Sequence, residues 1–252
     1  MKQRTFLLFA LFTFSSASLF AQDEKIETDR PGETQTVALT KKGYFQAEFG
    51  LRKEQQNSED YTFFHPRAQL KYGLSSRFEL RAELTAATEK QYSNQEFRHG
   101  LQPVEVGLKA KLLEQKGALP ATTFYTQIGI PNWASKDHQE EHLSPKFRLL
   151  FENKLTDKIK LTYNAGAEWK VEGAPPQWLY TLAPEVEISE KWDAFVETFA
   201  FLQSGQAPQH SIDGGFAYYA TNNVKLDVWA GKGLSKEAPD YFIAGGISFR
   251  FK

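Results

Sequence analysis

The residues whose types and spacing could support metal chemistry form the stretch HQEEH, at positions 138–142. Two histidines four residues apart, with a glutamate directly before the second, match H-x-x-E-H, a zinc-protease signature. A zinc protease needs those histidines on a stable helix inside a walled cleft, with a third ligand. The stretch lies instead within polar residues 131–144, and the residues around it encode no cleft. We therefore predict a solvated charged loop here, with no metal site and no cofactor.

A second pair, His210 and Ser211, has the residue types of a hydrolase. A nucleophilic serine needs a histidine base within hydrogen-bonding reach and a third group that orients the histidine. Adjacent residues on a strand point to opposite faces, so these two side chains are not expected to cooperate. A lipid-modifying enzyme is therefore only the third hypothesis for function, and no catalytic residues are predicted.

The elements that must position any site are β-strands, because most of the chain after residue 42 alternates between apolar and polar residues. In the first run, for example, Phe45 and Phe49 share one face, whereas Gln46 and Glu48 share the other. The runs are about 9–13 residues long, close to what a tilted strand needs to cross a bilayer. Twelve are predicted, at residues 43–53, 61–74, 77–88, 102–113, 120–131, 145–155, 158–169, 177–188, 192–202, 210–220, 224–233 and 241–252.

The connections between these runs alternate in length. Short turns at 75–76, 114–118, 156–157, 189–191 and 221–223 alternate with longer polar loops at 54–60, 88–101, 131–144, 170–176, 203–209 and 234–240. Short turns on one side and long loops on the other are typical of outer-membrane barrels. In hydrocarbon, backbone groups must be paired within the protein, which leaves helices and closed barrels. We therefore predict an all-β fold, a closed antiparallel transmembrane β-barrel of about twelve strands, in residues 43–252.

The start of the chain and its composition narrow the class of protein further. Residues 1–21 run from a basic start through an apolar stretch to small residues, which predicts a secretory signal peptide. Residues 22–42 lack strand periodicity and are predicted to form a periplasmic or plug segment. The net charge of -1 excludes a broad nucleic-acid footprint. A mean hydropathy of -0.50 and the lack of a later apolar helix-length run exclude a helical membrane protein. The predicted location is the bacterial outer membrane.

The polar faces of the predicted strands carry charges of both signs, which would point into the barrel lumen. They could line a pore that selects solutes by charge and size. Alternatively they could form a static network that fills the lumen, and the nearly balanced signs favour this network with a narrow passage. The lumen and solute-binding candidates are Glu48, Arg67, Lys71, Arg81, Glu83, Glu105, Lys109, Arg148, Glu197, Asp227 and Arg250, with Glu168, Glu185 and Glu187 on the same faces.

Two local features could shape this lumen. If Phe195 and Phe199 share the face of Glu197, they would form an apolar constriction beside one carboxylate; the alternative is an interfacial strand end. Asp29 and Arg30 are plug candidates, since the segment that holds them could tuck into the lumen and meet its charges. The alternative for that segment is a periplasmic tether.

Several stretches together resemble one known family. They are ETDRP (27–31), KGYFQ (42–46), LKYGL (70–74), ELR (79–81), EVGLK (105–109), LLE (112–114), FVE (195–197), GGFAYY (214–219), LD (226–227) and GGISFRF (245–251). In this order and spacing they are similar to the transporter-like outer-membrane barrels labelled "putative meta-pathway of phenol degradation". The resemblance covers nearly the whole chain after the signal peptide. It implies a barrel, a transport role and, from the label, aromatic substrates; it implies no catalytic residues.

The favoured function is therefore a passive channel for small solutes, hydrophobic or aromatic ones among them. The alternative is a structural barrel with a blocked lumen. The expected partners are outer-membrane lipid, the outer-membrane insertion machinery and a small-molecule solute, with no nucleic acid.

Overall fold

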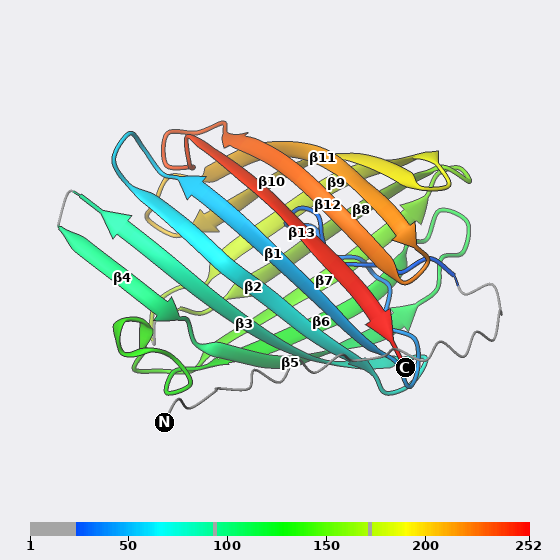
Figure 1. Ribbon diagram of the computed structural model, residues 1–252, viewed down its shortest axis with the longest axis horizontal. Coiled ribbons are helices and arrows are strands. Elements are labelled where there is room, and N and C mark those ends of the chain that lie inside the picture. Colours follow the sequence, from blue (N-terminus) through cyan, green and yellow to red (C-terminus); the bar gives the residue numbers. More distant parts are fainter. Residues whose placement is uncertain (1–23, 93–94, 171–172) are drawn as a thin grey trace, which may run out of the picture.

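The computed structural model describes residues 24–92, 95–170 and 173–252, and these residues are almost entirely β-structure (Figure 1). Their strands are β1 (Phe45–Gln55), β2 (Tyr61–Gly73), β3 (Phe78–Gln91), β4 (Glu96–Leu101), β5 (Val104–Leu113), β6 (Ala121–Ile130), β7 (Ser144–Lys154), β8 (Ile159–Glu168), β9 (Gln177–Ser189), β10 (Trp192–Gln203), β11 (Gln209–Thr221), β12 (Val224–Gly233) and β13 (Tyr241–Phe251). A short 3-10 helix, η1 (Lys136–His138), lies between β6 and β7. Nowhere in these ranges is a helix long and apolar enough to cross a membrane. The predicted signal peptide, residues 1–21, lies outside them.

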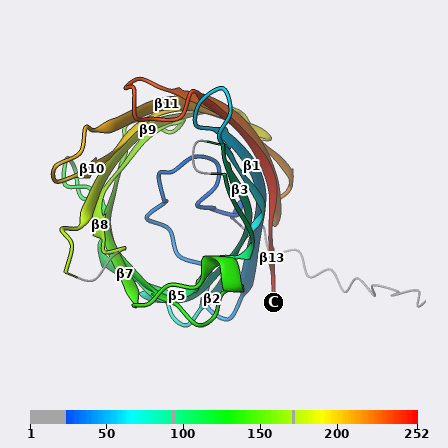
Figure 2. The same cartoon turned by 90° about the vertical axis from the view of Figure 1, so that its left-hand side faces the viewer.

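Twelve of these strands close into a ring (Figure 2). Every neighbouring pair is antiparallel, and the ring closes where β1 pairs with both β2 and β13. Phe45 of β1 thus lies between Phe251 and Tyr72. Closure leaves no strand edge unpaired within the ring, which is the condition for a sheet to cross hydrocarbon. The predicted closed antiparallel barrel of about twelve strands is confirmed.

The remaining strand, β4, corrects the prediction that residues 88–101 form a loop. β3 extends to Gln91. Its C-terminal part pairs with β4, and its N-terminal part pairs with β5. Gln102 still donates its backbone N–H to the carbonyl of Thr85, at 2.8 Å. Pro103 follows and has no N–H, so the ladder is interrupted there and one long strand is divided into β4 and β5. The hairpin of β3 and β4 extends beyond the ring at the left of Figure 1.

Apolar and charged side chains are distributed over the two faces of the barrel wall in the reverse of the way found in a soluble protein. Phe45, Leu80 and Val196 are 50%, 47% and 54% exposed on the outer face, whereas Glu48 and Lys109 are 0% exposed on the inner face. A continuous exposed apolar belt of this kind is stable in lipid, and charged residues are stable within the barrel when they are paired. The period-two alternation of the sequence therefore becomes a lipid-facing exterior and a polar lumen.

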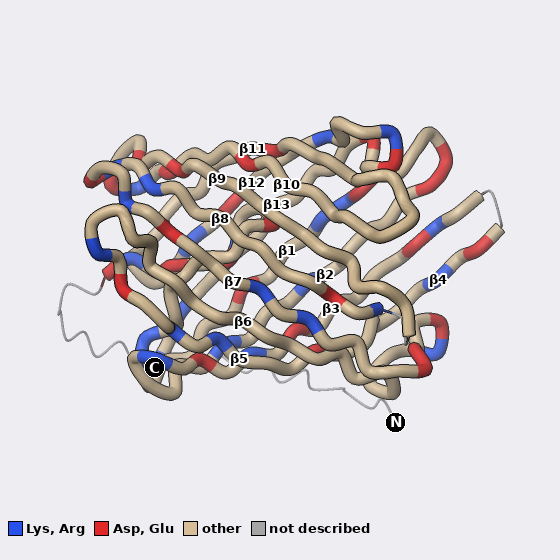
Figure 3. The backbone as a smooth tube through the Cα atoms, turned by 180° about the vertical axis from the view of Figure 1, so that it is seen from behind, with Lys and Arg blue, Asp and Glu red and all other residues tan. Residues whose placement is uncertain are grey.

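The loops distinguish the two ends of the barrel. The connections 74–77, 155–158, 190–191 and 222–223 are short turns at one end, where the chain also finishes after β13. Longer connections, such as 131–143 and 234–240, lie at the other end. Charged residues gather in the loops at both ends and recur along the strands (Figure 3). The layout is that of outer-membrane barrels, in which the short turns face the periplasm and the long loops face outward.

Candidate functional site: the lumen and its N-terminal segment

The N-terminal segment, residues 24–42, lies inside the ring (the blue chain in Figure 2). Ile26 and Val37 are 0% and 6% exposed there. Most of the segment has no strand partner, so its backbone N–H groups need acceptors elsewhere. Side chains of the wall supply these acceptors. The Glu48 carboxylate accepts the N–H groups of Asp29 and Arg30 at 3.1 and 3.2 Å, and the Glu197 carboxylate accepts those of Glu33 and Thr34 at 2.8 and 2.6 Å. Asn164 accepts the N–H of Gln35 at 2.8 Å, and Glu79 accepts the N–H of Thr40 at 2.6 Å.

Asp29 is the ionic anchor of this segment. Its carboxylate pairs with Lys71 at 2.5 Å, with Lys109 at 2.8 Å and with Arg81. The side chains of all four residues are at most 2% exposed. Buried charges are stable only when they are paired, and three cations from β2, β3 and β5 here share one carboxylate from the segment.

The Arg30 side chain crosses two glycines of the wall to reach β12. Its guanidinium binds Asp227 of β12 in two places, Nε to Oδ2 at 3.1 Å and Nη2 to Oδ1 at 2.8 Å. On the way it crosses Gly50 of β1 and Gly246 of β13, which face each other across the two strands. The three atoms nearest to a Cβ atom added at Gly50 would all belong to the Arg30 guanidinium. Glycine at this position therefore makes room for the side chain that crosses it.

Replacing Gly50 with alanine is expected to displace Arg30 from Asp227 without disturbing the sheet. The lost charge-assisted hydrogen bonds are worth about 1.5–3 kcal/mol, so amide hydrogen exchange in residues 29–35 should quicken about tenfold or more. Asp227→Asn should have a similar effect from the other side of the pair. Leu51→Ala, on the lipid face of the same strand, is the control. Unchanged exchange in both lumen variants would contradict this role for Arg30.

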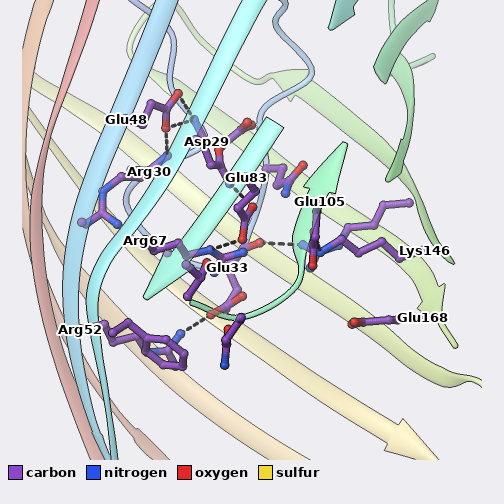
Figure 4. Close-up of a pocket in the computed structure, with 18 of the residues that line it drawn as sticks. Asp29, Arg30, Glu33, Glu48, Arg52, Arg67, Glu83, Glu105, Lys146 and Glu168 are labelled. Atoms are coloured by element: carbon purple, nitrogen blue, oxygen red, sulfur yellow. Dashed lines mark hydrogen bonds and ion pairs between the residues drawn. The ribbon is translucent and has the colours of Figure 1, made fainter. Parts of the chain in front are cut away.

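Above the segment, towards the long loops, lies a cavity of about 350 Å³ (Figure 4). Residues at the long-loop ends of the strands line it, among them Glu54, Gln102 and Gln177, so it reaches that end of the barrel. One part of its wall is ionic, and the charges are mostly paired: Arg52 with Glu33, Arg67 with Glu83 at 2.7 Å, and Lys146 with Glu105. Phe64, Phe201 and Trp229 add aromatic surface. The cavity could hold a small molecule with both polar and apolar parts.

On the other side of the segment the space is much smaller. A cavity of about 30 Å³ is lined by Pro31 and Thr34 of the segment and by Lys160 and Glu185 of the wall. Arg30 lines this cavity and the larger one, so it lies between them. The segment, rather than the strand side chains, therefore limits the depth of the larger cavity.

The predicted lumen residues separate into groups when they are placed in the structure. Glu48, Arg67, Glu83, Glu105, Arg148 and Glu168 line the larger cavity. Lys71, Arg81 and Lys109 bind Asp29, Glu197 binds the backbone of the segment, and Asp227 binds Arg30. Arg250 is at the short-turn rim, where it donates to the carbonyl of Glu24 at 2.7 Å. Glu185 and Glu187 pair with Lys160 and Lys25.

Several residues of the cavity were missed from the sequence. Lys146 and Trp229 lie two positions from Arg148 and Asp227 on the same strand faces, so the alternation contained the signal for both. Glu33 belongs to the segment without periodicity, and no local pattern could have indicated its contact with Arg52.

Phe195, Glu197 and Phe199 do share the inward face of β10, where they are 8%, 1% and 3% exposed. The two phenylalanines pack in a cluster with Trp229 and Phe242. The Glu197 carboxylate, however, accepts the N–H groups of the N-terminal segment. An apolar cluster therefore lies on the same face as this carboxylate, and the protein's own N-terminal segment binds the carboxylate.

In each of the two motifs with possible catalytic chemistry, the paired residues lie in different surroundings. His138 is buried at the end of η1, whereas the His142 side chain is 47% exposed. Across the described ranges, no group of three or more histidine or acidic side chains is arranged to hold a metal ion. His210 and the hydroxyl of Tyr180 are hydrogen-bonded at 3.1 Å, while Ser211 is buried on the lumen face. His210 and Ser211 thus point to opposite faces of β11.

Comparison with known proteins agrees with this architecture. Residues 28–251 match the family described as "Putative MetA-pathway of phenol degradation". No curated protein matches the chain. An outer membrane channel from Pseudomonas putida F1 is similar at 10% identity with a TM-score of 0.68, over 88% of this chain and 99% of that chain. The KdgM porin (11% identity, TM-score 0.56) and the NanC porin (9%, 0.54) each cover 81% of this chain, with 99% and 98% of their own chains covered.

These structural similarities concern the fold alone, because the identities are low. The closed ring with its lipid-facing belt belongs in the bacterial outer membrane. The family match covers nearly the whole described chain. The protein therefore belongs to the family "Putative MetA-pathway of phenol degradation", whose fold here is an outer-membrane β-barrel.

Proposed function

We propose that this protein is a passive channel for small solutes, and that displacement of its N-terminal segment sets the width of the passage. The observation that carries the proposal is the cavity of about 350 Å³, which reaches the long-loop end and is limited in depth by residues 24–42. A lumen filled only for stability would have no need of a cavity of small-molecule size.

The chemistry of the segment also supports a displaceable plug. It is held mainly by hydrogen bonds and ion pairs with the wall. Contacts of this kind can be exchanged for water when the segment moves, whereas the strands are held by continuous ladders. The family label suggests aromatic solutes, which we include in the proposal because Phe201 and Trp229 line the cavity. Contact with outer-membrane lipid and with the insertion machinery is part of the same proposal.

A reversible cross-link tests whether the segment must move. The hydroxyl oxygens of Thr34 and Thr181 are 2.7 Å apart, and the chain has no cysteine. Thr34→Cys with Thr181→Cys therefore introduces the only two thiols, on side chains that are in contact, so that oxidation can join them. Oxidation should lower the conductance in planar bilayers, and a reductant should restore it. The single variant Thr181→Cys is the control and should not respond; equal conductance of the oxidised and reduced double variant would contradict the proposal.

A structural barrel with a blocked lumen is the second candidate, favoured by the many contacts of the segment with the wall. It predicts no steady current from the folded wild-type protein and none after reduction of the cysteine pair. Heat-modifiable migration on gels checks that each preparation is folded.

A further inference from the structure

Among the residues that the structure describes, one buried arginine of the larger cavity has no carboxylate within ion-pair distance. Four arginines line this cavity: Arg30, Arg52, Arg67 and Arg148. The first three pair with Asp227, Glu33 and Glu83, respectively. Within the described ranges, no carboxylate lies within ion-pair distance, 4.0 Å, of Arg148.

Arg148 is 7% exposed, and its only hydrogen bond in the described part of the chain joins Nη1 to the backbone carbonyl of Glu33, at 3.1 Å. Its Nε is buried and has no hydrogen-bond partner among the same residues. The Glu33 carboxylate is close enough to interact with Arg148 electrostatically, but Arg52 already binds it. A buried cation with an unused donor is costly, and such a group commonly awaits a ligand, an ion or water.

The wall beside Arg148 leaves room for its side chain. Gly166 of β8 lies directly opposite Arg148 of β7, and a Cβ atom at Gly166 would collide with the Arg148 side chain and the neighbouring backbone. Glycine at 166 thus makes room for the arginine stem against the wall. The planar guanidinium presents a fork of N–H donors, which matches the two oxygens of a carboxylate.

The same cavity has an apolar part. Phe201 and Trp229 line it, and the indole N–H of Trp229 is buried without a partner among the described residues. The volume, about 350 Å³, is in the range of sites for small molecules. Anions without an apolar body would leave this aromatic surface uncovered.

We infer that the larger cavity binds small organic anions that carry one carboxylate-type group on an apolar body, and that Arg148 binds the anionic group. This inference rests on the proposed channel function and names its class of solute. Neutral molecules of the same shape should bind more weakly, because they cannot form a charge-assisted hydrogen bond with the Arg148 guanidinium.

Calorimetric titration of the folded protein in detergent with sodium benzoate, and with benzyl alcohol as the neutral counterpart, tests the inference. Wild-type protein should bind benzoate at least about tenfold more tightly than benzyl alcohol, as charge-assisted hydrogen bonds in a buried site imply. Arg148→Gln should remove that preference and leave the affinity for benzyl alcohol within about twofold. Arg148→Lys should retain part of it, because it keeps the charge but not the fork.

Arg98→Gln is the matched control, since Arg98 is half exposed on β4 and pairs with Glu96 outside the cavity. It removes the same charge and should not change either affinity. Equal binding of the two ligands, no binding of benzoate, or a preference that survives Arg148→Gln would each overturn the inference.

Conductance of the same preparations in potassium chloride distinguishes failure of this inference from failure of the proposed channel function. If the barrel conducts but does not prefer benzoate, the channel proposal stands and the anion site is overturned. If the barrel does not conduct but prefers benzoate, the anion site stands and the channel proposal is overturned.

Discussion

Replacing Asp29 with alanine is expected to raise the conductance of the barrel several-fold, because it removes the carboxylate that anchors the N-terminal segment. Lys71 and Arg81 keep other acidic neighbours, Glu48 and Glu79. Lys109, which is 0% exposed, has no ion pair other than the one with Asp29 in the described ranges. Breaking a buried ion pair by removing one partner costs about 3–5 kcal/mol. A loss of this size shifts the docking equilibrium of the segment by on the order of 10²–10⁴-fold.

Single-channel recording in planar bilayers measures this effect, and deletion of residues 24–40 gives the conductance of the unplugged barrel for comparison. Asp157→Ala is the control, since Asp157 is an exposed acid in a short turn and its loss changes the net charge equally. If the deletion raises the conductance and Asp29→Ala does not, the anchor is elsewhere in the segment. If neither raises it, the segment does not limit the passage.

Replacing Leu108 with arginine should destabilise the barrel in lipid by about 2–4 kcal/mol, the cost of an arginine on the lipid face near the bilayer midplane. Leu108 lies midway along β5, is 37% exposed and pairs with Leu80 on the neighbouring strand. Its side chain points into lipid, where a guanidinium loses hydration and finds no carboxylate. Urea unfolding of protein reconstituted in phospholipid vesicles, followed by tryptophan fluorescence, gives the change in free energy.

Leu234→Arg is the matched substitution outside the membrane. Leu234 is 57% exposed in the loop after β12, so a charge there stays in water and should change the free energy of unfolding by less than about 0.5 kcal/mol. An equal loss in both variants would contradict the assignment of the lipid face. A loss in Leu108→Arg alone would support it.

The wall of the barrel could be predicted from the sequence almost residue by residue. Each strand of the ring was expected within a few residues of its observed bounds, because side-chain direction in a strand depends only on whether a position is odd or even. The inward direction of Glu48, Lys109 and Arg148 follows from the same rule. β4 was missed because Pro103 interrupts the ladder and because residues 96–101 lack clear alternation.

The interior contacts could not be predicted in this way. Residues 24–42 have no period, and their acceptors come from strands that are far away in the sequence. Arg30 and Asp227 are 197 positions apart, and they meet only because the ring closes between β1 and β13. The place of Gly50 beneath Arg30 and the missing partner of Arg148 likewise depend on the path of the segment through the lumen.

The sequence by itself therefore determined the class of fold, the number of strands in the ring and the face on which each residue lies, since these depend on local alternation and on the need to pair backbone groups in lipid. Only the tertiary structure decided which charges are neutralised by which, how far the lumen is filled and which cation is left for a ligand. Those outcomes depend on distances between residues on different strands, and the closure of the ring and the path of the segment set these distances.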